Sequence, residues 1–233
     1  MITLPTQIVK RTAVAIAGAF CQAGDMLRIA ALVLALLAST FTSSVSARDV
    51  DTWRFDPVHT QVVLFADHLG LSHGVGRLKI RSGWLRFDPD DWSRAQVDVV
   101  IDVGSLDMGD PKWTATVLSA QFLDVARWPD ARYTSSSVEK TAPDRGIVNG
   151  TLELHGVRLP LALELTFNRI GRDPYAFKTK AGFSARATID RFAFGMERYR
   201  DVVGADVELR IEVEAIRDPT AARGDAADAD QEH

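Results

Sequence analysis

The amino-acid sequence predicts an all-β fold, and three observations support that class. Apolar and polar residues alternate with a period of two in several segments, turn-forming residues separate these segments, and only one short stretch has a helical composition. Such alternation is typical of strands with one face on a core and the other in water. The pattern favours a β-sandwich or a β-barrel, and closure into a barrel removes the exposed strand edges of an open sheet.

The clearest strand pair lies in the stretch from Trp53 to Pro89, where a glycine-rich reversal joins two alternating segments. The face that we assign to the interior carries Val62, Leu64, Ala66, His68, Leu78, Ile80, Leu85 and Phe87. The opposite face carries Arg77, Lys79, Arg81, Trp84 and Arg86. Gly83 interrupts the alternation, and a glycine at such a phase slip predicts a bulge or a sharp bend.

Six further segments alternate in the same way: residues 97–103, 132–138, 147–154, 157–167, 181–190 and 206–216. With the bent strand of the first pair counted once, we expect about eight strands, mostly neighbours in sequence. Residues 111–118 predict one short helix with Pro111 in its first turn. A closed sheet of eight strands has an interior just wide enough for side chains or for one small ligand.

The first 47 residues predict a secretory signal peptide. An apolar run over residues 29–38 follows Arg28, and small residues ending in Val45-Ser46-Ala47 come after it. The run is too short to span a bilayer, which needs about 20 residues. We therefore expect a periplasmic protein whose mature chain begins near Arg48.

A second apolar block, residues 12–21, follows the basic pair at positions 10–11. Translation that starts at Met26 would explain this block, and so would an unusually long signal peptide or an uncleaved anchor. Asp25 and Arg28 interrupt the apolar sequence and argue against the anchor.

Charge and cysteine content narrow the classes of function. The chain carries a net charge of −4, of which residues 1–47 hold +2 and residues 218–233 hold −4, leaving −2 on residues 48–217. No basic block offers the electrostatic footprint of a nucleic-acid-binding protein. Cys21, the one cysteine, would leave with the signal peptide, so no disulfide is expected. The acidic tail, 218–233, has no apolar period and is predicted to be disordered.

Five segments of the mature chain carry a family resemblance. They are DPVHTQVVLFADHLGLSHGVGRL, SGWLRFDPDD, FLDVARWPDARYTSSSV, VNGTLELHGVRLPLALEL and AGFSARATIDRFAFGM, and they run in family order through residues 52–217. With these segments the chain resembles the YceI-like proteins, a bacterial family of lipocalin-like, polyisoprenoid-binding periplasmic barrels.

The resemblance implies an extended, eight-stranded antiparallel barrel with one short helical excursion over residues 48–217. Its apolar interior would hold an isoprenoid lipid, either a polyprenyl chain or an isoprenoid quinone, and it would have no catalytic residues. The chain departs from the family at two places where a head group would be met. Asp67 stands where a basic residue is frequent, and residues 112–124 replace a charged, histidine-containing helix.

The residues that we expect to line the lumen are inward-facing aliphatic and aromatic side chains together with one histidine. They are Leu64, Ala66, His68, Leu78, Ile80, Leu85, Phe87, Val99, Ile101, Phe122, Leu152, Leu154, Leu163, Leu165, Phe183, Phe192 and Phe194. Two hypotheses follow. The first is a lipid carrier that a transient contact with a membrane or membrane protein would load. The second is a structural or stress-response barrel that binds nothing and has a filled interior.

The histidines and tryptophans leave several roles open. His68 faces inward and is either a head-group contact or a structural residue, whereas His59 and His155 lie at turns and predict local hydrogen bonds. Trp84 and Trp92 are assigned to the outer face, as ordinary surface residues or as a homodimer interface.

No catalytic or metal motif is recognised in the sequence. His68 and His73 do not have a metal-ligand spacing, and no cysteine assists them, so no metal or cofactor is expected. The chain lacks a nucleophile elbow, a phosphate-binding glycine loop and a zinc-protease helix motif. Its acidic residues fall mostly on solvent faces, which does not suggest a catalytic carboxylate pair. We therefore predict a binding protein and not an enzyme.

Overall fold

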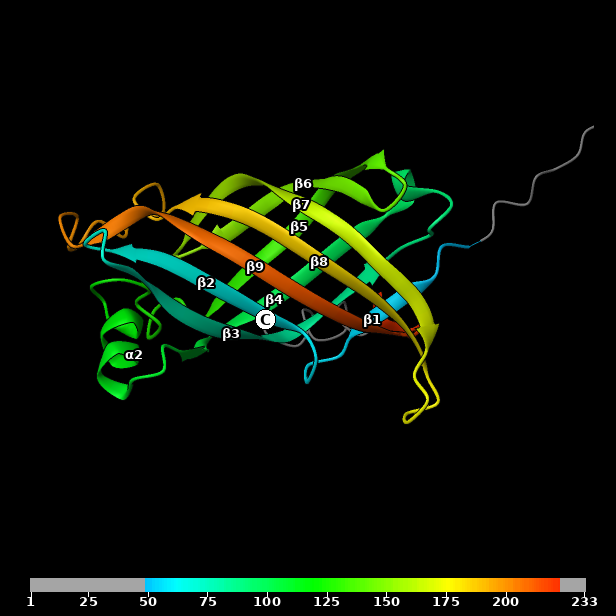
Figure 1. Ribbon diagram of the computed structural model, residues 1–233, viewed down its shortest axis with the longest axis horizontal. Helices are drawn as coiled ribbons and strands as arrows, with labels where there is room; N and C mark the ends of the chain where they lie inside the picture. The colour runs from blue at the N-terminus through cyan, green and yellow to red at the C-terminus, as the bar shows by residue number, and fades with distance from the viewer. Residues whose placement is uncertain (1–48, 223–233) are drawn as a thin grey trace, which may run out of the picture. The chain divides into compact units, whose positions relative to one another are not determined.

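The computed structural model describes residues 49–222, which form a closed antiparallel β-barrel (Figure 1). Its eight long strands are β2 (Gln61–His68), β3 (Ser72–Arg86), β4 (Gln96–Asp107), β5 (Asp130–Ala142), β6 (Arg145–Leu154), β7 (Val157–Arg172), β8 (Thr179–Asp190) and β9 (Val203–Arg217). Strands that follow one another in sequence pair with one another, and β9 pairs with β2 to close the ring. The predicted barrel is confirmed.

A short strand, β1 (Thr52–Phe55), was not predicted as a separate element. It pairs with both β3 and β9, where Trp53 lies opposite Leu85 and Arg217. Strand β2 pairs with the same two neighbours further along. Residues 52–68 therefore occupy one position in the barrel as a strand that is broken at residues 56–60.

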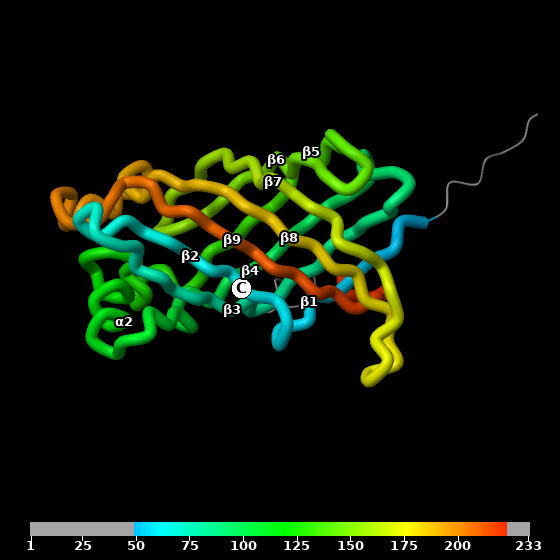
Figure 2. Tube along the Cα trace, in the orientation of Figure 1, coloured from blue at the N-terminus to red at the C-terminus, as the bar shows by residue number. Residues whose placement is uncertain are grey.

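The connections define two different ends of the barrel (Figure 2). One end, which we call the helix end, carries the β2–β3 turn, the β6–β7 turn, the β8–β9 loop and helix α2 (Pro111–Leu118). The other, which we call the plug end, carries β1, the β7–β8 loop and the short 3-10 helix η1 (Trp92–Arg94). Helix α2 has the predicted bounds, and the Asp110 carboxylate caps it by accepting from the backbone N–H groups of Lys112 and Trp113.

Aromatic side chains fill the plug end. The rings of Phe87, Trp92, Phe167 and Phe183 contact one another with centroids 4.9–6.3 Å apart. Trp92 is only 3% exposed, so its assignment to the outer face is wrong. Its ring turns inward because it stands in η1 after the strand alternation has ended, and its indole N–H donates to the Pro89 carbonyl (3.1 Å). Of the tryptophan pair proposed for a homodimer, only Trp84 remains near the surface.

The strands are longer than the alternation predicted, since β3, β7 and β9 each span 15 or 16 residues. The bend predicted at Gly83 is present. The pairing of β3 with β4 shifts register between Ile80 and Ser82, and Gly83 has a φ of +139°. A Cβ atom there would lie 2.5 Å from the Asp98 carbonyl oxygen, so the close approach of the two strands requires glycine.

Several predictions concern residues that the structure does not describe. The signal peptide over residues 1–47, the start at Met26 and Cys21 all lie outside the described residues. The predicted acidic tail, residues 218–233, is described only as far as residue 222. At its start, Asp218 donates its backbone N–H to the Thr52 carbonyl (2.9 Å). Within residues 49–222, no helix is long and apolar enough to cross a membrane.

Candidate functional site

The barrel encloses a cavity of about 440 Å³, to which all eight long strands contribute side chains. Its size falls in the range of about 300–1,000 Å³ that is typical of small-molecule sites. The lining is aliphatic and aromatic over most of its length, because alternation along each strand points one set of apolar side chains inward.

Fifteen of the seventeen predicted lumen residues border the cavity. They are Leu64, Ala66, His68, Leu78, Ile80, Leu85, Phe87, Val99, Ile101, Phe122, Leu152, Leu154, Leu163, Leu165 and Phe183. Arg77, Lys79 and Arg186 are exposed, as their assignment to the outer face predicts. Arg86 was placed on the same face but is half-buried and borders the cavity at the plug end.

The placement of Phe192 and Phe194 in the lumen is wrong. Strand β8 ends at Asp190, whose carboxylate accepts from the Phe192 backbone N–H (2.8 Å), so the alternation does not continue beyond it. The Phe192 ring packs against the guanidinium groups of Arg191 and Arg200 at 4.5 and 4.3 Å. Phe194 is buried beneath the loop, where its carbonyl lies 2.9 Å from His155 Nδ1.

The cavity approaches the surface mainly at the helix end. Three of the four exposed residues in its lining, Trp113, Thr116 and Tyr199, lie there, whereas Gln96 is the exposed one at the plug end. Helix α2 lies against the mouth, and the Trp113 ring meets the His68 ring edge-on with centroids 5.9 Å apart. The helix end is therefore the more open end of the cavity, and aromatic rings fill most of the plug end.

Two glycines of β3 make room for the segment that covers the mouth. A Cβ atom on Gly76 would lie 2.6 Å from Met108 Sδ, and one on Gly74 would lie 3.4 Å from the Trp113 ring. The sequence shows these residues only as a glycine-rich reversal. Their packing role was missed because Met108 and Trp113 belong to a connection about 30 residues further along the chain.

Arg191 is a second residue of the site that sequence reasoning missed. Its side chain is only 3% exposed and borders the cavity, and burial lowers its pKa below the ordinary value. Its guanidinium donates to the backbone carbonyls of Met196, Arg198, Tyr199, Val203 and Gly204. Arg191 thereby fixes the β8–β9 loop beside the mouth.

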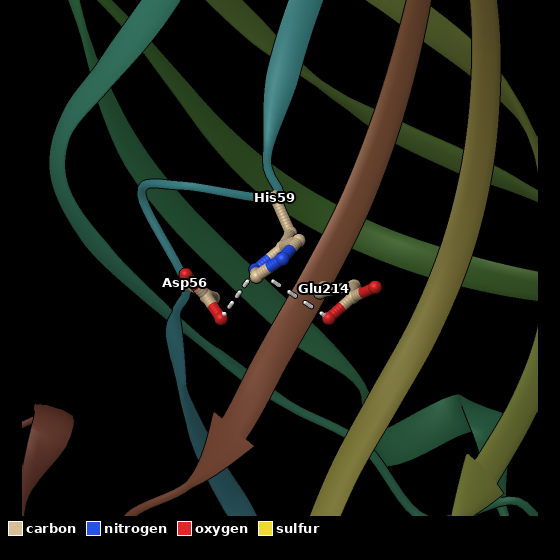
Figure 3. A group of neighbouring side chains, drawn as sticks. All are labelled: Asp56, His59 and Glu214. Atoms are coloured by element: carbon tan, nitrogen blue, oxygen red, sulfur yellow. Dashed lines mark hydrogen bonds and ion pairs between the residues drawn. The ribbon is translucent and has the colours of Figure 1, made fainter. Parts of the chain in front are cut away.

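Asp56, His59 and Glu214 converge where the break between β1 and β2 meets β9 (Figure 3). His59 Nδ1 lies 2.9 Å from Asp56 Oδ2 and 3.8 Å from Glu214 Oε2. Three ligand atoms in this arrangement resemble a metal site, but Lys180 Nζ already lies 2.9 Å from the same oxygen of each carboxylate. The ammonium supplies the positive charge that a metal ion would bring, and we assign the cluster a structural role.

The same ammonium binds a third carboxylate, because Asp173 Oδ2 of the β7–β8 loop lies 3.1 Å from Lys180 Nζ. Burial of Asp56 opposes its ionisation, but hydrogen bonds from Lys180, His59 and the Val58 backbone N–H outweigh that effect and lower its pKa to about 2. Hydrogen bonds to Glu214 and Asp56 raise the pKa of Lys180 above its ordinary value. The network ties together the β1–β2 break, β9 and the β7–β8 loop.

Fold and cavity define the class of protein: a closed antiparallel barrel with an apolar lumen, as in lipocalin-like binding proteins. Residues 53–215 match the family model described as the YceI-like domain. The chain belongs to the YceI-like family, as the resemblance of its five segments predicted.

Curated relatives and solved structures agree with this assignment. A UPF0312 protein of Shewanella baltica (strain OS185) is 29% identical over 189 residues, which cover 81% of this chain and 97% of the relative. The YCEI protein of Campylobacter jejuni is 27% identical, with a TM-score of 0.59 over 65% of this chain and 90% of that one.

A polyisoprenoid binding domain from Saccharophagus degradans, implicated in plant cell wall breakdown, has a TM-score of 0.52 at 12% identity, covering 73% of this chain and all of that one. At this identity the likeness establishes the fold alone.

Proposed function

We propose that this protein binds an isoprenoid lipid, a polyprenyl chain or an isoprenoid quinone, in the lumen of its barrel. The observation that carries the proposal is the apolar cavity of about 440 Å³, which is closed by an aromatic plug at one end and reaches the surface at the other. A barrel with a purely structural role needs no such cavity. Membership of the YceI-like family supports the same ligand class, because the resemblance to that family implies an isoprenoid ligand.

The lumen offers a large area for an apolar chain and few hydrogen bonds. Each methylene-sized group that leaves water gains roughly 0.8 kcal/mol, so a few isoprene units give a large gross driving force. Ordering a flexible chain offsets much of this gain. Because the contacts along the tail are non-directional, we expect the cavity to discriminate among tails by length and girth. The protein would hold its ligand without converting it.

We also propose that the lipid enters from a membrane surface at the helix end. Large apolar side chains are exposed around this mouth, namely Leu69, Leu71, Val75, Trp113 and Tyr199. Aromatic residues such as Trp113 and Tyr199 are favoured where water meets lipid. A mouth with an apolar rim would let an isoprenoid tail pass from a bilayer into the lumen with little exposure to water.

Export to the periplasm remains part of the proposal and rests on the signal-like sequence of residues 1–47. Intact-mass measurement of the protein from a periplasmic fraction tests it. We expect a chain that begins near Arg48, and a periplasmic species that retains Met26 would contradict the assignment.

Filling the lumen tests the binding function directly. Ala185 of β8 is buried and borders the cavity, whereas Thr188 on the same strand faces solvent. Ala185→Trp should place an indole in the lumen and abolish uptake of an isoprenoid quinone from micelles, and Thr188→Trp, the matched control, should bind like the wild type. If delipidated wild-type protein stays folded but takes up neither a quinone nor a polyprenol, the proposal is wrong and the structural alternative is favoured.

A further inference from the structure

Polar side chains at the mouth of the cavity bear on the head group of the ligand. Five polar residues border the cavity at the helix end: Asp67, His68, Thr116, Arg191 and Tyr199. They are the groups that a head group would meet after the tail has entered the apolar lumen. What they can donate and accept therefore determines which head group is accepted; this inference rests on the proposed function.

Arg191 has no donor to offer to an anion. A guanidinium has five N–H groups, and in this protein they are directed at five backbone carbonyls of the loop that follows β8. A phosphate could recruit Arg191 only by breaking bonds that hold this loop, which would leave buried carbonyl groups without partners. The positive charge of Arg191 is thus already committed to the fold.

The remaining charge at the mouth is unfavourable for an anion. Asp67 lies at a bulge near the end of β2, and its Oδ2 accepts from the Gly70 backbone N–H (3.0 Å). No lysine borders the cavity among residues 49–222. Arg86, the other arginine of the lining, lies at the plug end, where it donates to Gln96 Oε1 (3.3 Å) and packs against the Trp84 ring. Among the residues that line the cavity, a phosphate at the mouth would therefore meet a carboxylate and no unengaged lysine or arginine.

His68 offers what a neutral head group needs. Its ring contacts Trp113, but within residues 49–222 no side-chain hydrogen bond reaches either ring nitrogen. An imidazole N–H at this position can donate to a carbonyl oxygen. The Thr116 hydroxyl is occupied, since it donates to the Lys112 carbonyl (2.9 Å).

We propose that the mouth selects isoprenoid lipids with a neutral, hydrogen-bond-accepting head group, such as the carbonyl of an isoprenoid quinone, over lipids with a phosphorylated head group. His68 is the donor to the neutral head group. Asp67 repels the anion, and the engaged guanidinium of Arg191 offers the anion no hydrogen bond.

Competitive loading of the delipidated full-length protein tests the proposal with three probes: an isoprenoid quinone, a polyprenyl monophosphate with a matched tail, and squalene, which has an isoprenoid chain and no head group. The quinone should bind at least about tenfold more tightly than the phosphate, as expected for an unpaired anion facing a carboxylate. Tighter or equal binding of the phosphate would overturn the proposal. Uptake of none of the three would overturn the proposed function itself.

Variants assign the selectivity to residues. Asp67→Asn should narrow the preference for quinone over phosphate by about three- to tenfold, whereas Asp201→Asn, an exposed carboxylate of the β8–β9 loop that does not border the cavity, should leave it unchanged. His68→Phe should weaken quinone binding by about three- to tenfold, the value of one hydrogen bond, without affecting squalene, and His68→Gln should restore part of the loss. A preference that neither Asp67→Asn nor His68→Phe alters would refute the assignment.

Discussion

Removal of the Lys180 ammonium should destabilise the barrel in a way that depends on pH. The Lys180 and Asp56 side chains are only 13% and 11% exposed, and they form an ion pair with each other. In Lys180→Met the carboxylates of Asp56, Asp173 and Glu214 would face one another without the ammonium. Removing one partner of a fully buried ion pair costs about 3–5 kcal/mol. Because Glu214 is partly exposed, we expect less here.

The pKa of Asp56 gives the magnitude. Its value of about 2 lies almost two pH units below that of an unperturbed aspartate, and each unit corresponds to about 1.4 kcal/mol. His59 and the Val58 backbone N–H supply part of this shift. We therefore expect Lys180→Met to lower the free energy of unfolding by about 2 kcal/mol at pH 7.

The pH dependence follows from the directions of the two shifts. Asp56 has a depressed pKa, so its contribution is present above about pH 4 and is lost as the pH falls toward 2. Lys180 has a raised pKa, so its contribution is present below its ordinary value of about 10.5 and is lost as the pH rises beyond it. The difference between wild type and variant should be constant between about pH 5 and pH 9 and should shrink outside that range.

Urea unfolding of the wild type, Lys180→Met, Asp56→Asn and the double variant from pH 2.5 to pH 9 measures the plateau and the acidic decline. The double-mutant cycle isolates the pair, and Lys79→Met, an exposed lysine on β3, is the control. A loss below about 0.5 kcal/mol, or one that does not decline under acidic conditions, would refute the account of this network.

Three further predictions concern the plug, the loop and the rim. Phe183→Ala removes a ring that contacts Phe87 and Phe167, and it should lower the free energy of unfolding by about 3 kcal/mol. This is the low end for a packed phenylalanine, because the ring also borders the cavity. Lys79→Ala should change stability by less than about 0.5 kcal/mol, and comparable losses at both positions would mean that the faces are assigned wrongly. Arg191→Lys replaces five N–H donors by three and should accelerate amide hydrogen exchange in residues 190–204. Arg200 is exposed, and Arg200→Lys is the control. Unchanged exchange in Arg191→Lys would contradict the role given to Arg191. Leu71→Asp should reduce quinone transfer from vesicles but not from detergent micelles, and equal transfer from both would argue against membrane contact through the rim.

The sequence was informative wherever a strand obeys simple alternation. Leu64, Leu78 and Ile80 were placed in the lumen correctly because period two fixes a face once one residue is assigned. The alternation failed where the strand stopped. Trp92 lies in η1 and Phe192 lies beyond the end of β8, so continuing the period put one ring outside the core and the other inside the lumen.

Charged residues were harder to predict than apolar ones. Nothing in the local sequence around Lys180 or Arg191 distinguishes them from the many basic residues that face solvent on other strands. The Lys180 side chain is largely covered because Asp56, which lies 124 residues earlier and beside β9, binds its ammonium. Arg191 is buried because the loop that follows it closes around its guanidinium. The first contact forms only when distant segments of the barrel meet, and the second depends on a loop conformation that strand alternation does not predict.

The different ends of the barrel also bear on how a lipid would lie inside it. An isoprenoid tail gains most by entering first, because the lumen beyond the mouth is apolar as far as the rings of Phe87 and Phe183. The plug sets the depth that the tail can reach, so any excess length has to remain at the helix end. A tail that just fills the lumen would place its head group beside Asp67 and His68, whereas a longer tail would push the head group outward. Selection by length and selection by head group would thus be made at opposite ends of the barrel, and substitutions in the plug should alter the first without altering the second.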